Sequence, residues 1–272
     1  MEPLSFVLAD PVSRAFAAGM IIAPLIGTLG VFAALKRMAL FGEGIGHASL
    51  AGVAVAVIGG VSALPVALAW GLCIAYAMYR LERSTRLPSD TILAILFTTS
   101  MAVGIVLFGA LGGAQDFEAL EEALFGSILS VGGGDLALTA LAALGIGAWV
   151  IHARRSLTFL SLSQESAAVS GVNVRLHTLL LYLSLAAAIV FGVKLVGLIL
   201  VSALLIIPSA AARQVARTFR GTLIMTVLLS ELAMILGLFA SIRFDLPSGA
   251  PIVLAASGLF AACAIVGRVR GS

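Results

Sequence analysis

Apolar residues fill long stretches along most of the chain, and charged or Gly/Pro-rich segments separate one stretch from the next. Each stretch approaches the roughly 20 apolar residues that an α-helix needs to cross the hydrocarbon core of a bilayer. The stretches cover residues 15–35, 44–61, 62–79, 91–111, 135–151, 176–192, 195–212, 221–241 and 249–267. The pattern therefore predicts an all-α protein, a polytopic bundle of eight or nine transmembrane helices in a single domain covering residues 1–272.

The apolar run over residues 176–208 is too long for one membrane-spanning helix. As a continuous helix it would measure about 50 Å, whereas the hydrocarbon core is about 30 Å thick. We predict that the helix breaks around Gly192, Val193 and Lys194, where a glycine and a charge interrupt the run.

The basic residues are distributed unevenly between the predicted loops. With the N-terminus outside and the C-terminus inside, 13 of the 16 Lys and Arg residues lie on the inner side, and Arg14, Lys194 and Arg243 lie outside. Because inner loops carry an excess of basic residues, we expect this orientation. The outer loop after the fourth span carries only acidic charges, which either are simply solvated or concentrate cations. These are Asp116, Glu118, Glu121 and Glu122.

Composition narrows the classes of function. Of 272 residues, 61% are hydrophobic and 11% are charged, which excludes a soluble globular domain and requires a lipid bilayer around the chain. The net charge of +3 is scattered, so no nucleic-acid partner is expected. The only lysines, Lys36 and Lys194, stand outside any Gly-Lys-Ser/Thr sequence, so a phosphate-binding loop is absent. We therefore expect a chain that is not itself an ATPase or another enzyme.

Glu43 and His47 form the first candidate site, at the start of the second span. They are four residues apart, so their side chains lie on one face of a helix and can meet at one ion. Carboxylate and imidazole ligands suit zinc or manganese. A flanking set of glycines predicts a narrow, unobstructed helix face beside the pair: Gly42, Gly44, Gly46 and Gly52. The alternative is an interfacial charge and a polar tether between helices.

A second intramembrane carboxylate, Glu231, lies in the middle of a predicted span. A bare carboxylate there costs roughly 2.5–3.5 kcal/mol on insertion scales. It either contributes to the metal pathway as a further ligand or makes a hydrogen bond between helices.

A short helix is predicted in the long inner loop that covers residues 156–175. Ser163 is its N-cap, Glu165 lies in its first turn and Gly171 ends it. Such a helix is too short to be stable alone, so it needs a partner surface. Docking on an ATPase subunit and lying at the membrane interface both satisfy that need. The docking residues would be Ser163, Gln164, Glu165, Ala167, Ala168 and Gly171.

Five blocks in order resemble signatures of the zinc, manganese and iron permease family of ABC transporters, and the resemblance covers nearly the whole chain. The first block differs from the family pattern, because Glu43 stands where the family has Asp and Ala51 where it has Pro. The carboxylate is retained but moved by one methylene. The blocks are residues 38–52, 90–95, 124–129, 194–208 and 244–250.

The resemblance implies the permease subunit of a transporter that imports a divalent metal ion across the bacterial inner membrane. It implies cytoplasmic ABC ATPase subunits, an extracytoplasmic metal-binding protein and a second permease copy, with the pathway between the two copies. Glu43 and His47 match the family's pathway positions, and the segment around Glu165 and Gly171 matches its coupling helix. The segment 193–208 is nearest to zinc-uptake members, so we expect zinc as the cargo and no permanently bound cofactor.

Three other readings stay open. A manganese or iron permease would use the same ligand types. An ion-coupled secondary carrier would use Glu43 and Glu231 as ion sites. An intramembrane metallohydrolase would use Glu43 and His47 as zinc ligands, although a catalytic zinc usually has three protein ligands.

Overall fold

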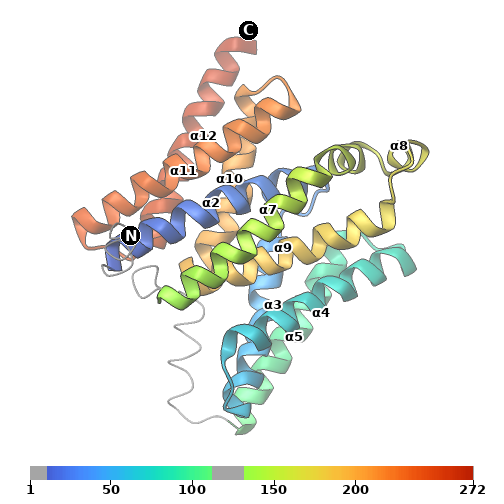
Figure 1. The fold of residues 1–272 in the computed structure, drawn as a ribbon, viewed down its shortest axis with the longest axis vertical. Helices are drawn as coiled ribbons and strands as arrows, with labels where there is room; N and C mark the ends of the chain where they lie inside the picture. The colour runs from blue at the N-terminus through green and yellow to red at the C-terminus, as the bar shows by residue number, and fades with distance from the viewer. Residues whose placement is uncertain (1–10, 112–131, 272) are drawn as a thin grey trace.

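The computed structural model describes residues 11–111 and 132–271, and in this part of the chain it is helical throughout (Figure 1). The described residues form nine long helices, and each is long and apolar enough to cross a membrane. They are α2 (Pro11–Leu35), α3 (Phe41–Gly59), α4 (Ala63–Ser84), α5 (Ser89–Leu111), α7 (Gly133–Leu162), α9 (Val174–Val196), α10 (Leu198–Val215), α11 (Phe219–Phe244) and α12 (Gly249–Gly271). The predicted all-α membrane bundle is confirmed. The acidic residues at 116–122 and the block at 124–129 lie outside the described residues.

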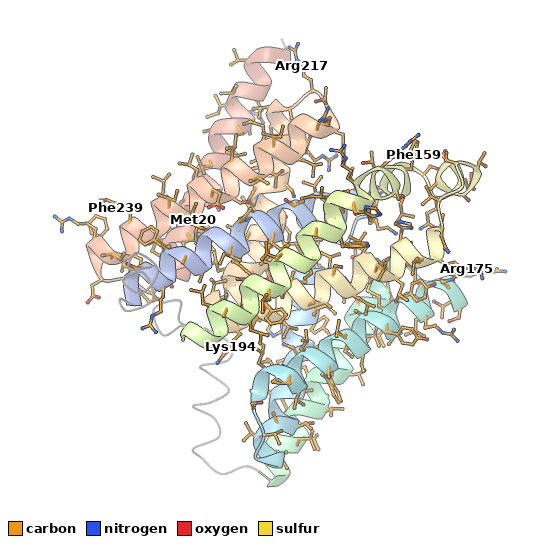
Figure 2. All side chains as sticks on the ribbon, viewed as in Figure 1. Met20, Phe159, Arg175, Lys194, Arg217 and Phe239 are labelled. Atoms are coloured by element: carbon orange, nitrogen blue, oxygen red, sulfur yellow. The ribbon has the colours of Figure 1, made fainter. Side chains whose placement is uncertain are left out.

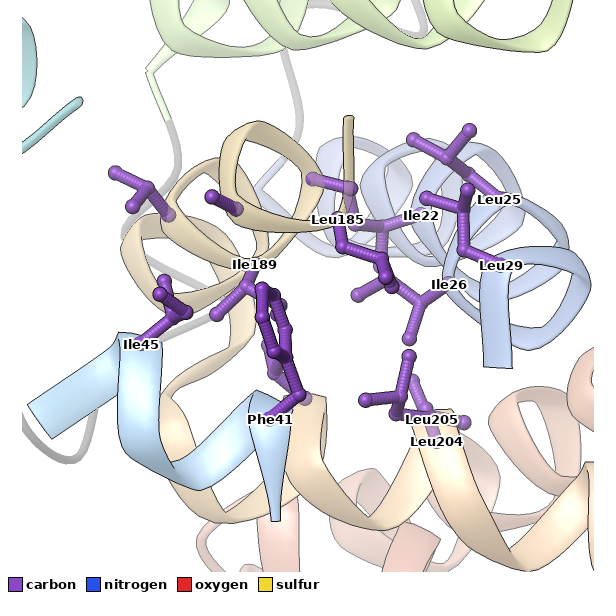
Figure 3. Close-up of a cluster of buried hydrophobic side chains, with 14 of the residues drawn as sticks. Ile22, Leu25, Ile26, Leu29, Phe41, Ile45, Leu185, Ile189, Leu204 and Leu205 are labelled. Carbon is purple, nitrogen blue, oxygen red and sulfur yellow. The ribbon is translucent and has the colours of Figure 1, made fainter. Parts of the chain in front are cut away.

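The core of the bundle lies where α2, α3, α9 and α10 meet (Figure 3). In lipid, close van der Waals packing rather than water exclusion holds helices together. Gly30 of α2 serves that packing, because a Cβ atom there would collide with the carbonyl oxygen of Leu205 on α10. The side chains that interlock at this junction include Ile22, Ile26 and Leu29 of α2, Phe41 and Ile45 of α3, Leu185 and Ile189 of α9, and Leu204 and Leu205 of α10.

The helix ends fall on two sides of the molecule. Figure 1 shows α8 (Gln164–Val169), the turn between α4 and α5 and the end of α12 towards one side, and the start of α2 and the turn between α11 and α12 towards the other. Arg175 and Arg217 lie on the first side and Lys194 on the second (Figure 2). This arrangement fits the predicted division of basic residues. The orientation of the two sides in the bilayer stays a prediction.

The apolar run over residues 176–208 is broken as predicted, but at Gly197 and not around Gly192, Val193 and Lys194. Helix α9 continues to Val196, and the chain turns at Gly197, whose φ of 85° and ψ of 161° are favoured only for glycine. Gly192 has another role, because a Cβ atom there would lie 2.7 Å from Val201 and 2.9 Å from Ile26. It is a packing residue within α9 and leaves the helix continuous.

The predicted loop over residues 156–175 is shorter than expected. Helix α7 continues to Leu162 and is 30 residues long. Its last turns remain helical because Leu157 and Leu160 are buried in the core. Only residue 163 and residues 170–173 connect α7, α8 and α9.

Candidate metal site

The first two turns of α3 hold Glu43 and His47 at the edge of the bundle. Phe41 and Ile45 on the same turns are fully buried in the core, which directs the Glu43 and His47 side chains away from it. The Glu43 side chain is 58% exposed and that of His47 is 25% exposed. The pair is therefore accessible from outside the single chain.

The two side chains converge as the spacing predicts. Nε2 of His47 lies 3.9 Å from Oε1 of Glu43, which is too long for a hydrogen bond. Two ligand atoms of one tetrahedral zinc ion lie roughly 3.4 Å apart, given bonds of about 2.1 Å. A small rotation of the exposed Glu43 side chain would bring the two atoms to that separation. The metal role itself stays a prediction.

One edge of the His47 ring is buried, and the other faces Glu43. Its Nδ1 atom is buried, with no hydrogen-bond partner in the part of the chain that the structure describes. The ring centroid lies 6.2 Å from that of Phe97 on α5. Nε2 is consequently the nitrogen that can bind the same metal ion as Glu43.

The glycines of this segment do not leave an unobstructed helix face, so that expectation is wrong. All four are buried and pack α3 against four neighbouring helices, α4, α5, α9 and α10. A Cβ atom on Gly42 would lie 3.3 Å from Cα of Ser202 on α10, and one on Gly52 would lie 2.8 Å from Cα of Ala67 on α4. Such close backbone approach is typical of small residues in membrane helices. The glycines hold α3 in place, and the open face is the one that carries Glu43.

A chain of hydrogen bonds beside His47 was not predicted from the sequence. Nε1 of Trp70 on α4 donates to Oγ of Ser100 on α5 at 2.7 Å, and Ser100 donates to the carbonyl oxygen of Ala48 at 2.8 Å. Ser100 is buried. These bonds tie two helices to the backbone next to His47. Two polar groups within apolar stretches are the only signal that the sequence offers for them.

Glu231 lies away from this pair. It is on α11, which packs against α2, α10 and α12, and its Oε2 atom is buried without a hydrogen-bond partner among the described residues. Within residues 11–111 and 132–271, no three His, Cys, Asp or Glu residues come together as a metal-binding group. The structure thus brings Glu43 and His47 together, and Glu231 does not lie with them. The role of Glu231 in the metal pathway stays a prediction.

The short helix of the inner segment is confirmed as α8. Oγ of Ser163 accepts a hydrogen bond of 3.2 Å from the backbone N–H of Ser166, so Ser163 is the N-cap. Gly171 has a φ of 77°, the left-handed conformation that ends helices. Ala167 is buried against the bundle, whereas the remaining proposed docking residues Gln164, Glu165 and Ala168 are exposed.

Fold and site together define a multi-pass helical membrane protein with a Glu–His pair at one edge and an exposed short helix between two spans. Residues 9–267 match the ABC 3 transport family. The chain belongs to that family and is a multi-pass protein of the bacterial inner membrane. The resemblance seen in the sequence is thereby confirmed.

Three similar proteins illustrate the range of the family. The chain is 31% identical to the "High-affinity zinc uptake system membrane protein ZnuB" of Haemophilus influenzae, over 89% of this chain and 92% of the relative. It is 35% identical to the "Manganese transport system membrane protein MntC" of Halalkalibacterium halodurans, over 91% and 84%. The structure of PsaBC from Streptococcus pneumoniae in complex with Fab superposes with a TM-score of 0.81 at 28% identity, covering 96% and 93%.

Proposed function

We propose that the chain is the membrane-spanning permease subunit of an ABC transporter that imports a divalent metal ion, with zinc as the first candidate. The observation that carries the proposal is the Glu43–His47 pair, whose ligand atoms lie 3.9 Å apart on an accessible face of α3. One carboxylate and one imidazole bind an ion weakly enough to release it. A relative named as a zinc uptake protein supports zinc as the cargo.

A second copy of the chain would complete the site. Glu43 is 58% exposed within a candidate span, and a charged side chain that faces lipid is costly. A surface that covers this face removes that cost. Two copies related by a two-fold axis would bring two Glu43–His47 pairs together, which gives the four ligands that zinc prefers.

Energy for transport would come from separate ATPase subunits. The sequence has no phosphate-binding loop, and α8 presents Gln164, Glu165 and Ala168 on an exposed face. Val169 on the same helix is 91% exposed, which is unusual for an apolar side chain without a partner. We assign this face to ATPase docking. An extracytoplasmic metal-binding protein would deliver the ion.

Manganese is the second candidate cargo, because the relative with 35% identity is named as a manganese transport protein. Manganese accepts both carboxylate and imidazole ligands, with a preference for oxygen. The lengthened carboxylate of Glu43 is compatible with either ion.

The test is purification of the chain with its copurifying ATPase, followed by reconstitution in proteoliposomes. ATP-dependent uptake of radioactive zinc, and its competition by manganese or iron, would establish the cargo. Uptake driven by an ion gradient without ATP would identify a secondary carrier instead. Hydrolysis of a peptide or ester by the zinc-loaded chain would support the metallohydrolase reading.

A further inference from the structure

A partly buried carboxylate joins three helices. Glu82, near the end of α4, accepts two hydrogen bonds: from the hydroxyl of Tyr182 on α9 at 2.6 Å and from the hydroxyl of Ser89 at the start of α5 at 2.9 Å. The Tyr182 side chain is completely buried. Hydrogen bonds to a charged group are stronger than those between neutral groups, and burial strengthens them further.

A lysine lies beside these two residues. Nζ of Lys36, in the turn between α2 and α3, is 5.4 Å from the centroid of the Tyr182 ring. Burial lowers the pKa of the Lys36 ammonium group, and the nearby Glu82 carboxylate opposes that shift. The turn that leads into α3 is therefore attracted to both Tyr182 and Glu82.

The same tyrosine also contacts α3 directly. Its ring centroid lies 5.8 Å from that of Phe41, the first residue of α3 and two positions before Glu43. Phe41 is fully buried. A displacement of Tyr182 is thus opposed by the packing of the turn that holds the candidate metal ligands.

Tyr182 lies about two turns, or roughly 12 Å, from the start of α9. Residues 170–173 connect α8 to α9, and Oδ1 of Asn173 in this short connection accepts a hydrogen bond of 3.1 Å from the backbone N–H of Leu176 at the start of α9. A helix is stiff over two turns. We therefore expect a movement of α8 that passes through this four-residue connection to shift the first part of α9, which includes Tyr182.

We propose that Tyr182 is a positioning residue that couples displacement of α8 to the metal-binding turn of α3. Its hydroxyl holds α9 to Glu82 of α4, and its ring holds Phe41. Rotation of α9 moves all these contacts together, so the Glu43–His47 pair responds to the α8 surface. The inference rests on the proposed function, because it takes α8 as the docking surface of an ATPase.

The test compares two variants that each remove one hydroxyl from the same carboxylate. Tyr182→Phe retains the ring but loses the bond between α9 and α4. Ser89→Ala, the matched control, loses a bond that connects only α4 with α5, the neighbouring helix in sequence. The measurement is the number of zinc ions transported per ATP hydrolysed by the reconstituted complex. We expect Tyr182→Phe to lower this ratio about tenfold, and Ser89→Ala to leave it close to that of the unmodified chain.

A second variant keeps the test decisive if Tyr182→Phe fails to assemble. Phe41→Leu retains a buried apolar side chain but loses the ring contact, and we expect it to lower the same ratio. An unchanged ratio in Tyr182→Phe, or in Phe41→Leu if only that variant assembles, would overturn the inference. So would an equal fall in Tyr182→Phe and Ser89→Ala. Absence of ATP-dependent uptake by the unmodified complex would instead overturn the proposed function.

Discussion

Ser100 donates a hydrogen bond of 2.8 Å to the carbonyl oxygen of Ala48, the residue that follows His47. The same hydroxyl accepts the indole N–H of Trp70 at 2.7 Å. One small side chain of α5 therefore links α4 to α3 beside the candidate metal pair. Because Ser100 is buried, no water can replace the bonds at low cost.

Ser100→Ala should destabilise the folded chain by about 1 kcal/mol, since interhelical hydrogen bonds in membrane proteins contribute roughly 0.6–1.7 kcal/mol. Ser49→Ala is the control, because among the described residues the buried Ser49 hydroxyl bonds only to the carbonyl of Gly46 within α3. Thermal unfolding of the purified chain in detergent measures both. Equal losses in the two variants would contradict a linking role for Ser100.

Gly171→Val should abolish ATP-driven uptake while the chain still inserts. A residue with a side chain in the left-handed conformation costs roughly 1–2 kcal/mol, and a β-branched residue is especially disfavoured there. No atom of the described residues lies within 4 Å of the position that a Cβ atom would take, so crowding plays no part. Uptake in proteoliposomes and retention of the ATPase on the purified chain measure the effect.

Gly171→Asn separates backbone conformation from other effects at this position. Asparagine tolerates the left-handed conformation better than other residues, so this variant should retain most of the uptake. If Gly171→Asn and Gly171→Val were equally inactive, a contact of the glycine itself, rather than its φ of 77°, would be responsible.

Gly52→Ala should weaken the packing of α3 against α4. The added methyl group would lie 2.8 Å from Cα of Ala67 and 3.0 Å from the carbonyl oxygen of Val66, and backbone atoms cannot move aside. Overpacking of this kind costs roughly 1–3 kcal/mol. Gly145→Ala on α7 is the control, because nothing among the described residues lies within 4 Å of its Cβ position. We expect a lower melting temperature only for Gly52→Ala.

Local sequence patterns predicted the elements of this fold better than their contacts. Nine apolar stretches correspond to the nine long helices among the described residues, and the cap at Ser163 and the stop at Gly171 were found as expected. The break after α9 was misplaced because two glycines occur in the same apolar run. Gly192 stays helical because it packs against Ile26 and Val201, so the chain breaks at Gly197 instead. Ile26 and Val201 belong to two other helices, α2 and α10.

The polar contacts around the site could not be predicted for a related reason. Tyr182 and Glu82 are 100 positions apart, and Ser100 and Ala48 are 52 apart. Helical periodicity relates residues three or four positions apart, as it did for Glu43 and His47. Which face of one helix meets which face of another depends on the assembled bundle.

The final prediction concerns His47 as a weak ligand of the transported ion. His47→Ala should lower zinc uptake at least about tenfold, by analogy with the loss when a metal-site residue is removed, without lowering the amount of protein in the membrane. Glu43→Asp should retain part of the uptake, because the carboxylate survives with a shorter reach. His152→Ala is the matched control, because His152 is exposed on α7. We expect this variant to take up zinc at the rate of the unmodified chain. A tether between helices needs only hydrogen bonding, which glutamine supplies, so substantial zinc uptake by His47→Gln would refute ligation by His47.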